Sequence, residues 1–480
     1  MAEENFKYQA KKAVIWSTLG SISNQAMQFA IGIVLARLLS PSDYGTIALP
    51  TIFLAIAQCF IDSGFGSALI RKPQITEEDL STAFYFNICV GIFFYALLFL
   101  CSPLIADFYN APILKDILRV TALSTLFGPL QSVHFSQFSR KMDFKTPAKI
   151  SLSSKFTTGI VGIILAFMGL GVWALVFQGV AGSLLSLILV WTLSPWRPQA
   201  KWSKESFHYL FGFGSKLLSS RILDVLYNNI IPVTLGKFYS SDVLGVFNRG
   251  YGYAALPYNQ LNGMLGPVFF PMFSKLQNDK DELFNYFRKV LRLLIFILAP
   301  LNLLLCALAK PLILFMITDK WADCIIVMQL MSISIILWPI QGLNMSLFSA
   351  MGHSDMVLKS NVVVKVLGLT TLLASLPFGL VAICATGILR SVLNVSWVAH
   401  YAGNISKFGA IKQFKEICPC LALSTCMCFF VLFVNSYLQS YFLQIVVGGS
   451  IGILFYLFFA KVFSFPELNE IKLLLKKRRK

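Results

Sequence analysis

Eight charged side chains lie inside long apolar segments of this sequence, and they are its strongest candidates for binding chemistry. A charge at the centre of a bilayer costs about 3 kcal/mol to insert, so such residues are expected to serve a function. Cations outnumber acids among them, which favours an anionic ligand, and guanidinium groups match phosphate oxygens in a bidentate geometry. The predicted ligand-binding cations are Arg249, Arg390, Arg221, Lys216, Lys155 and Lys365, and the acids that are candidates for a coupling ion are Asp62 and Asp224.

The spacing of three polar residues predicts a common helix face. Arg221, Asp224 and Asn228 follow one another at i, i+3 and i+7. That face either lines a wet interior or holds a structural pair between Arg221 and Asp224. Lys155 and Lys365 also have an alternative, because a lysine near a helix end can extend its ammonium group to the membrane surface.

The composition shows what kind of element must position these charges. The chain has 480 residues, of which 56% are hydrophobic and only 13% charged, and its mean hydropathy is +0.71. Apolar runs of about 20 residues suit membrane-spanning helices. The sequence therefore predicts an all-α polytopic membrane protein whose first span is retained rather than cleaved.

Fourteen hydrophobic spans are predicted, and the fourth and eighth are the weakest of these predictions, because the fourth contains Arg119 and His134 and the eighth contains Arg249 and three prolines. Most of the 40 Lys and Arg residues fall in alternate loops, which predicts that both termini are cytoplasmic. The predicted spans are 13–37, 44–69, 83–104, 117–138, 147–169, 171–193, 207–235, 241–273, 286–309, 323–348, 357–376, 378–402, 415–435 and 440–461.

A repeat with an offset of 200 residues links the two halves of the chain. LARLLSPSDYG at 35–45 aligns with LGKFYSSDVLG at 235–245, so Ser40 matches Ser240 and Gly45 matches Gly245. Six spans separate the copies, so the halves have the same orientation, as in transporters with parallel repeats. The predicted domains are a six-helix lobe at 1–200, a second at 201–405, and a hairpin with a basic tail at 406–480. The polar faces also align, and the first contributes Ser21, Asn24 and Gln28 to a predicted polar cavity.

Several other functions find no support in the sequence. Cys418, Cys420, Cys426 and Cys428 are spaced so that neighbours point to opposite helix faces, which favours packing over a metal site. The basic residues are dispersed over short loops, which argues against nucleic-acid binding despite the net charge of +18. We find no phosphate-binding loop, zinc-protease motif or nucleophile elbow, and expect neither enzymatic activity nor a cofactor.

Two segments resemble a known family. The segment at 35–72, which begins LARLLSPSDYG, and the segment at 240–279, which ends PMFSKLQND, are similar to polysaccharide transporters of the multidrug/oligosaccharidyl-lipid/polysaccharide exporter superfamily. The similarity is to the Wzx-like branch, associated with colanic acid and lipopolysaccharide-type export. The resemblance implies a fold of two six-helix lobes and a C-terminal hairpin, with alternating access.

The resemblance also implies a substrate and a location. A member of this family moves undecaprenyl-diphosphate-linked oligosaccharide across the bacterial inner membrane and works beside polysaccharide assembly proteins. Related lipid II flippases have a cationic cavity, with which Arg221 and Arg249 agree in kind. Two alternatives are a cation-coupled multidrug exporter, which predicts an acidic cavity, and a membrane glycan polymerase or ligase, which predicts a large outer loop.

Overall fold

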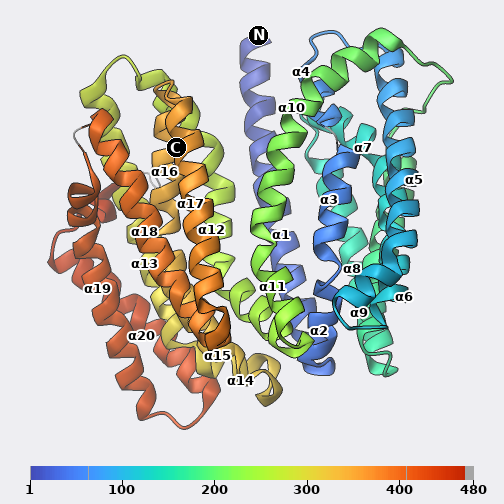
Figure 1. Ribbon diagram of the computed structural model, residues 1–480. Helices are drawn as coiled ribbons and strands as arrows, with labels where there is room; N and C mark the ends of the chain where they lie inside the picture. Colours follow the sequence, from blue (N-terminus) through green and yellow to red (C-terminus); the bar gives the residue numbers. More distant parts are fainter. Residues whose placement is uncertain (1, 63, 407, 471–480) are drawn as a thin grey trace. The chain divides into compact units, whose positions relative to one another are not determined.

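The computed structural model describes residues 2–62, 64–406 and 408–470, and most of them are helical (Figure 1). No strand occurs in these ranges. Eleven helical segments among the described residues are long and apolar enough to cross a membrane. The prediction of an all-α polytopic membrane protein is confirmed.

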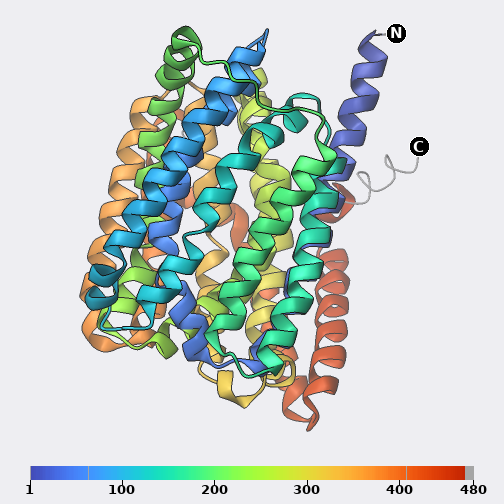
Figure 2. The ribbon, with the colours of Figure 1, turned by 90° about the vertical axis from the view of Figure 1, so that its right-hand side faces the viewer.

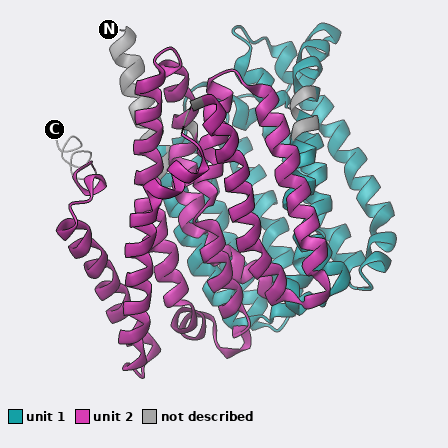
Figure 3. Ribbon diagram, turned by 60° about the vertical axis from the view of Figure 1, so that its left-hand side comes forward, with its two compact units in different colours: residues 1–245 teal, residues 246–480 magenta. Residues whose placement is uncertain are grey.

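The chain forms two compact units, residues 1–245 and 246–480 (Figure 3). Unit 1 contains α1 (Ala2–Leu38), α2 (Pro41–Ala48), α3 (Thr51–Asp62), α4 (Phe65–Arg71), α5 (Glu77–Phe108), α6 (Leu114–Thr121), α7 (Ser124–Arg140), α8 (Lys145–Phe167), α9 (Val172–Leu193), α10 (Lys204–Asn228), α11 (Ile230–Phe238) and the start of α12. Unit 2 contains the rest of α12 (Ser241–Leu276), α13 (Lys280–Ala307), α14 (Ala309–Ile317), α15 (Cys324–Ile335), α16 (Trp338–Ala350), α17 (Ser354–Ser375), α18 (Leu380–Ser406), α19 (Ala410–Ser436) and α20 (Tyr441–Val462).

Three predicted spans are not among the eleven, although all three are helical. The span at 117–138 is divided between α6 and α7, and the span at 207–235 between α10 and α11. The span at 241–273 is part of the single long helix α12. Breaks and polar side chains set these three apart, and the total of fourteen crossings stays a prediction.

Unit 1 is held together by close helix packing (Figure 2). Helix α1 packs on α8, α8 on α9, and α10 on α3, α4 and α5. Small residues allow these approaches, as expected where lipid surrounds the bundle: a Cβ at Gly159 would lie 2.2 Å from the Ile31 side chain. Contacts thus place α10 and α11 in unit 1, whereas the sequence repeat starts its second lobe at residue 201.

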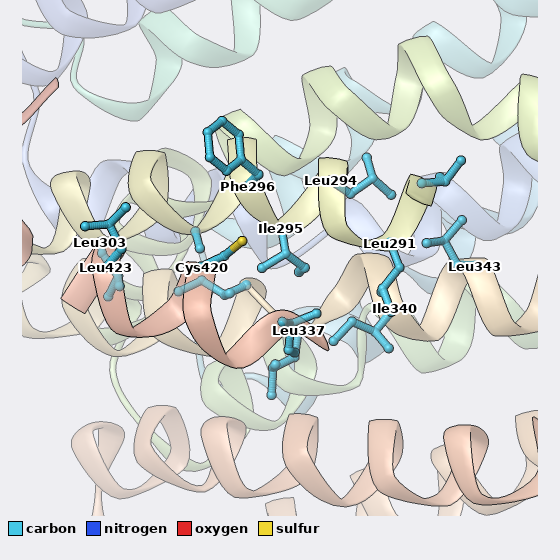
Figure 4. Close-up of a cluster of buried hydrophobic side chains, with 14 of the residues drawn as sticks. Leu291, Leu294, Ile295, Phe296, Leu303, Leu337, Ile340, Leu343, Cys420 and Leu423 are labelled. Carbon is cyan, nitrogen blue, oxygen red and sulfur yellow. The ribbon is translucent and has the colours of Figure 1, made fainter. Parts of the chain in front are cut away.

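Unit 2 has its own apolar core between α12, α13, α16 and α19 (Figure 4). Leu291 and Ile295 of α13 meet Ile340 of α16, and Cys420 of α19 lies in the same cluster. The hydroxyl of Tyr456 donates a hydrogen bond to the carbonyl oxygen of Phe296 at 3.0 Å, so α20 is also tied to α13.

The two repeated turns have matching caps and pack against each other within unit 1. Ser40 forms a capping box with Asp43 at the start of α2, and Ser240 Oγ accepts from the backbone N–H of Val243 at the start of α12. Ser42 Oγ lies 2.8 Å from Ser241 Oγ. A Cβ at Gly45 would lie 1.7 Å from the Ser241 carbonyl oxygen, and one at Gly245 would lie 2.0 Å from the Pro41 carbonyl oxygen. The two backbones are therefore in direct, reciprocal contact.

Replacing either glycine at this contact is expected to destabilise the protein. In Gly45→Ala or Gly245→Ala the new methyl group overlaps a carbonyl oxygen, and overpacking of this kind costs about 1–3 kcal/mol. The thermal midpoint of the purified full-length protein should fall by several degrees. Gly179→Ala on α9 is the control, because a Cβ there meets nothing within 4 Å. Equal midpoints for Gly45→Ala and Gly179→Ala would contradict the packing described.

Candidate functional site

A polar cavity of about 550 Å³ lies inside unit 1. Five of the helices that line it are α3, α4, α5, α7 and α10, and α9 adds one residue. Among the described side chains, its wall combines one acid and one cation with neutral amides, hydroxyls and glycines. The lining residues are Gln58, Asp62, Gly64, Gly66, Ser67, Ile70, Asn87, Ser124, Gly128, Gln131, Ser132, Phe135, Ser136, Ser139, Ser183 and Arg221.

Two of the predicted site residues, Asp62 and Arg221, meet at this cavity. They interact electrostatically, α3 contributing the acid and α10 the cation. Gln58 lies one turn before Asp62 on α3, and its Nε2 donates to Asp62 Oδ1 at 2.9 Å. The structure therefore brings Arg221 to Asp62, which the sequence did not pair with it.

Two helix breaks shape the cavity wall. Gly64 follows α3 with φ +70°, and a Cβ there would lie 2.7 Å from the Cα of Gly214 on α10. This position needs glycine both for its left-handed backbone and for the close approach of α10. At the second break, between α6 and α7, the Oγ of Ser124 donates to the carbonyl of Thr121 at 2.7 Å.

Asn87 is the most enclosed polar side chain of the wall, with 2% of its surface exposed. Its Nδ2 donates to Ser132 Oγ at 3.0 Å, which fixes the orientation of the amide. Its Oδ1 is buried and has no hydrogen-bond partner among the described residues. A buried carbonyl without a donor is unusual in proteins and points to a missing partner.

The other predicted residues of unit 1 whose side chains are described do not line this cavity. Ser21, Gln28, Asp224 and Asn228 are exposed. Asn24 is half-buried, and its Oδ1 accepts from Ser151 Oγ at 3.1 Å. Lys155 is half-buried on α8, and the side chain of Lys216 lies outside the part of the structure that is described.

A second group of predicted residues lies in unit 2, where cations are placed beside aromatic rings. Arg249 is half-buried on α12, with its guanidinium carbon 5.8 Å from the ring centre of Tyr253 and 5.9 Å from that of the buried Trp321. Such distances allow cation–π attraction. Arg249 is thus held by aromatic side chains of the same unit.

Arg390 belongs to a neighbouring polar cluster of unit 2. It interacts electrostatically with Tyr251 of α12, whose ring centre is 6.3 Å from that of Trp338. Trp338 Nε1 donates to Ser391 Oγ at 3.3 Å, next to Arg390 on α18. Arg249 and Arg390 therefore both have tyrosines of α12 as neighbours. Lys365 is half-buried on α17.

The cysteine pattern does not converge on one point. Cys420 and Cys428 are buried, whereas Cys418 and Cys426 are exposed. Within the described ranges, no group of three or more His, Cys, Asp or Glu side chains is arranged to hold a metal ion.

Sequence reasoning missed most of the neutral residues of the cavity. Ser132, Ser136 and Ser139 recur at i, i+4 and i+7 on α7, so they share a face with Phe135 between them. A signal was present, because the span at 117–138 was one of the two weakest predicted crossings. Polar residues of this span, which was predicted as a weak membrane crossing, line the cavity.

Comparison with known proteins agrees with this architecture. A family model described as "Polysaccharide biosynthesis protein" matches residues 34–326. Teichuronic acid biosynthesis protein TuaB of Bacillus subtilis (strain 168) is 26% identical over 385 residues, which are 80% of this chain and 77% of TuaB. Lipopolysaccharide biosynthesis protein WzxC of Escherichia coli (strain K12) is 24% identical over 353 residues, covering 72% of this chain and 71% of WzxC.

Among solved structures, the lipid II flippase MurJ in an inward closed conformation has the same fold. The TM-score is 0.75 with 15% sequence identity, and the match covers 93% of this chain and 98% of MurJ. The predicted resemblance to polysaccharide exporters is confirmed. Because the family model spans more than half of its length, the chain belongs to the polysaccharide biosynthesis protein family.

Proposed function

We propose that the protein is a flippase that moves a lipid-linked oligosaccharide across the membrane by alternating access. The observation that carries this proposal is the polar cavity of about 550 Å³ inside a membrane-embedded helical unit. Polar walls in a membrane protein are costly and are kept where a hydrophilic ligand or water passes. The names of TuaB, WzxC and MurJ support a glycan-bearing lipid as that ligand.

The lipid carrier in this proposal is undecaprenyl diphosphate, and unit 2 supplies its charge recognition. Arg249 and Arg390 are guanidinium groups beside tyrosines of α12. A guanidinium can contact two phosphate oxygens at once, whereas a lysine acts as a point charge. Lys365, Lys155 and Lys216 contribute to the positive potential rather than to a specific clamp. The proposal includes no bond-breaking step.

The location and architecture complete the proposal. The protein lies in the bacterial inner membrane with both termini in the cytoplasm and passes its glycan to polysaccharide assembly proteins outside. The repeat divides it into lobes at 1–200 and 201–405 and a C-terminal part at 406–480. Moving about two negative charges outward across an inside-negative membrane is favourable by roughly 2.3 kcal/mol per charge per 100 mV.

A multidrug exporter of the same superfamily is the second candidate. Cation export favours a cavity with excess acid, as predicted for that class. The cavity of unit 1 instead balances Asp62 with Arg221. Unit 2 places Arg249 and Arg390 in its polar clusters. The charge therefore favours an anionic lipid over a cationic drug.

Proteoliposomes test the transport directly. We expect full-length protein to carry a synthetic polyprenyl-diphosphate oligosaccharide from one leaflet to the other, as measured by protection from an added glycosidase. A diffusion potential of ~100 mV, negative on the starting side, should speed this transfer because the diphosphate moves down the field. Liposomes without protein are the control. Absence of protein-dependent transfer would refute the function.

Neutralising the two arginines of unit 2 should impair export. Arg249→Gln and Arg390→Gln each remove a charge-assisted contact worth about 1.5–3 kcal/mol, equivalent to roughly 10- to 100-fold in rate. The measurement is export in cells that lack their own exporter, at equal protein level. Lys359→Gln is the control, because Lys359 is exposed on α17 and lies 3.9 Å from Asp355. Full activity of both arginine variants would remove them from the site.

The topology can be mapped with reporter fusions. Alkaline phosphatase fused after Asn110, in the turn between α5 and α6, should be active because this loop is predicted to face outward. A fusion after Gly352, between α16 and α17, should be inactive, and a fluorescent protein at the C-terminus should fluoresce. The reverse pattern would show that the orientation predicted from the Lys and Arg residues of the loops is wrong.

A further inference from the structure

Most serine hydroxyls of the unit 1 cavity are available to a ligand as hydrogen-bond acceptors, and this restricts the ligand. Four of its serine hydroxyls donate to a carbonyl of the same helix or of the segment just before it, and a hydroxyl that has donated keeps its lone pairs for accepting. The four bonds are Ser124 to Thr121 at 2.7 Å, Ser132 to Pro129 at 3.0 Å, Ser136 to Ser132 at 3.1 Å and Ser183 to Gly179 at 3.2 Å.

Each amide of the wall uses one of its two N–H donors inside the protein. Gln58 Nε2 donates to Asp62, Asn87 Nδ2 to Ser132, and Gln131 Nε2 to the carbonyl of Phe127 at 3.2 Å. Gln131 Oε1 is occupied by the hydroxyl of Ser186 at 2.8 Å, whereas the buried Oδ1 of Asn87 has no partner. The groups left for a ligand are thus hydroxyl and amide acceptors, the second N–H of each amide and a guanidinium, a mixed set that suits a ligand with both donors and acceptors.

A diphosphate or a carboxylated sugar fits this wall poorly. Phosphate and carboxylate groups only accept hydrogen bonds at neutral pH, so they offer no donor to the acceptors of the wall, and Asp62 would repel them. Arg221 is the cation that lines the cavity, and it already interacts with Asp62. A neutral sugar ring, in contrast, brings several O–H donors and an apolar face. Phe135 offers that face a ring to pack against, and the cavity volume suits a small polar ligand.

We propose that the unit 1 cavity binds an uncharged sugar ring of the glycan, with Asp62, Asn87 Oδ1 and the serine hydroxyls accepting its O–H groups. The cavity is a specificity site for the saccharide, separate in its chemistry from the arginines that attract the diphosphate. This inference rests on the proposed function. It assigns the buried acceptor of Asn87, whose partner within the described chain is absent, to a sugar hydroxyl.

Paired lipid substrates test the proposal in proteoliposomes of the full-length protein. One polyprenyl-diphosphate lipid carries a neutral hexose disaccharide, a second carries a hexuronic acid in place of one hexose, and a third carries an amino sugar. We expect the wild type to transfer the neutral lipid fastest. Asp62→Asn replaces an acceptor by a donor and removes the charge, so it should raise the acidic-to-neutral rate ratio about tenfold.

A second variant and a control separate binding from folding. Asn87→Leu should lower transfer of the neutral lipid about tenfold while leaving a polyprenyl diphosphate without sugar unaffected. Asp107→Asn, at the exposed end of α5, should leave all ratios unchanged. Thermal midpoints are measured for each variant, and a rate is compared only between lipids on the same folded protein.

The outcomes distinguish this inference from the proposed function. If the wild type transfers none of the lipids, the function itself fails. If it transfers them and both variants keep the wild-type ratios, the sugar site is wrong while the function stands. Preference of the wild type for the amino-sugar lipid would also overturn the proposal, because the cavity would then bind an ammonium group.

Discussion

A polypeptide that breaks its helices within a membrane must satisfy the freed backbone groups from within the protein. Hydrocarbon offers no hydrogen bonds, and each unpaired group there costs several kcal/mol. Unit 1 interrupts its helices between α3 and α4 and between α6 and α7. At the second break, the hydroxyls of Thr121, Ser124 and Thr125 donate to carbonyls of Ile117, Thr121 and Ala122, each at 2.7 Å. The breaks are therefore stable because hydroxyl side chains accompany them.

Hydrogen bonds from hydroxyl side chains to backbone carbonyls also determine which groups the cavity offers to a ligand. A serine that donates to the backbone has no donor left and faces the interior as an acceptor. Arg140 contributes at the far end of α4, where its guanidinium donates to the carbonyl of Leu69 at 3.0 Å and to that of Pro73 at 2.5 Å. This contact stabilises the short helix that carries Ser67 and Gly66 into the wall. The same serine hydrogen bonds thus satisfy backbone carbonyls and leave the hydroxyls as acceptors for a ligand.

The sequence predicted the features that depend on local patterns. Long apolar runs predicted the helices, and the Ser40 and Ser240 turns predicted by the repeat have matching caps in the structure. Asp62 and Arg221 were singled out because a charge in an apolar run is conspicuous. Their meeting was not predicted, since it depends on the close approach of Gly64 and Gly214 between helices distant in sequence.

The neutral polar residues of the cavity wall were not predicted from the sequence. Ser132 and Ser136 are ordinary in membrane helices, where serine also joins helices or bonds to its own backbone. Asn87 is one amide in a long apolar helix, and only its geometry reveals an orphaned oxygen. The compact units also differ from the repeat, because α10 packs on α3, α4 and α5. The repeat is defined by sequence similarity, whereas the two compact units are defined by which helices pack together.

Under the proposed function, there is an energetic reason for recognising the diphosphate and the sugar with different groups. A cavity that held the diphosphate with many cations would have to release it against strong attraction on every cycle. Hydrogen bonds from sugar hydroxyls to neutral acceptors are individually weak and directional, so they discriminate between glycans without a large charge to overcome. Among the described side chains of the unit 1 cavity, Asp62 and Arg221 balance each other in formal charge. The membrane potential then acts on the diphosphate alone, and the choice of sugar does not alter the electrical work of export.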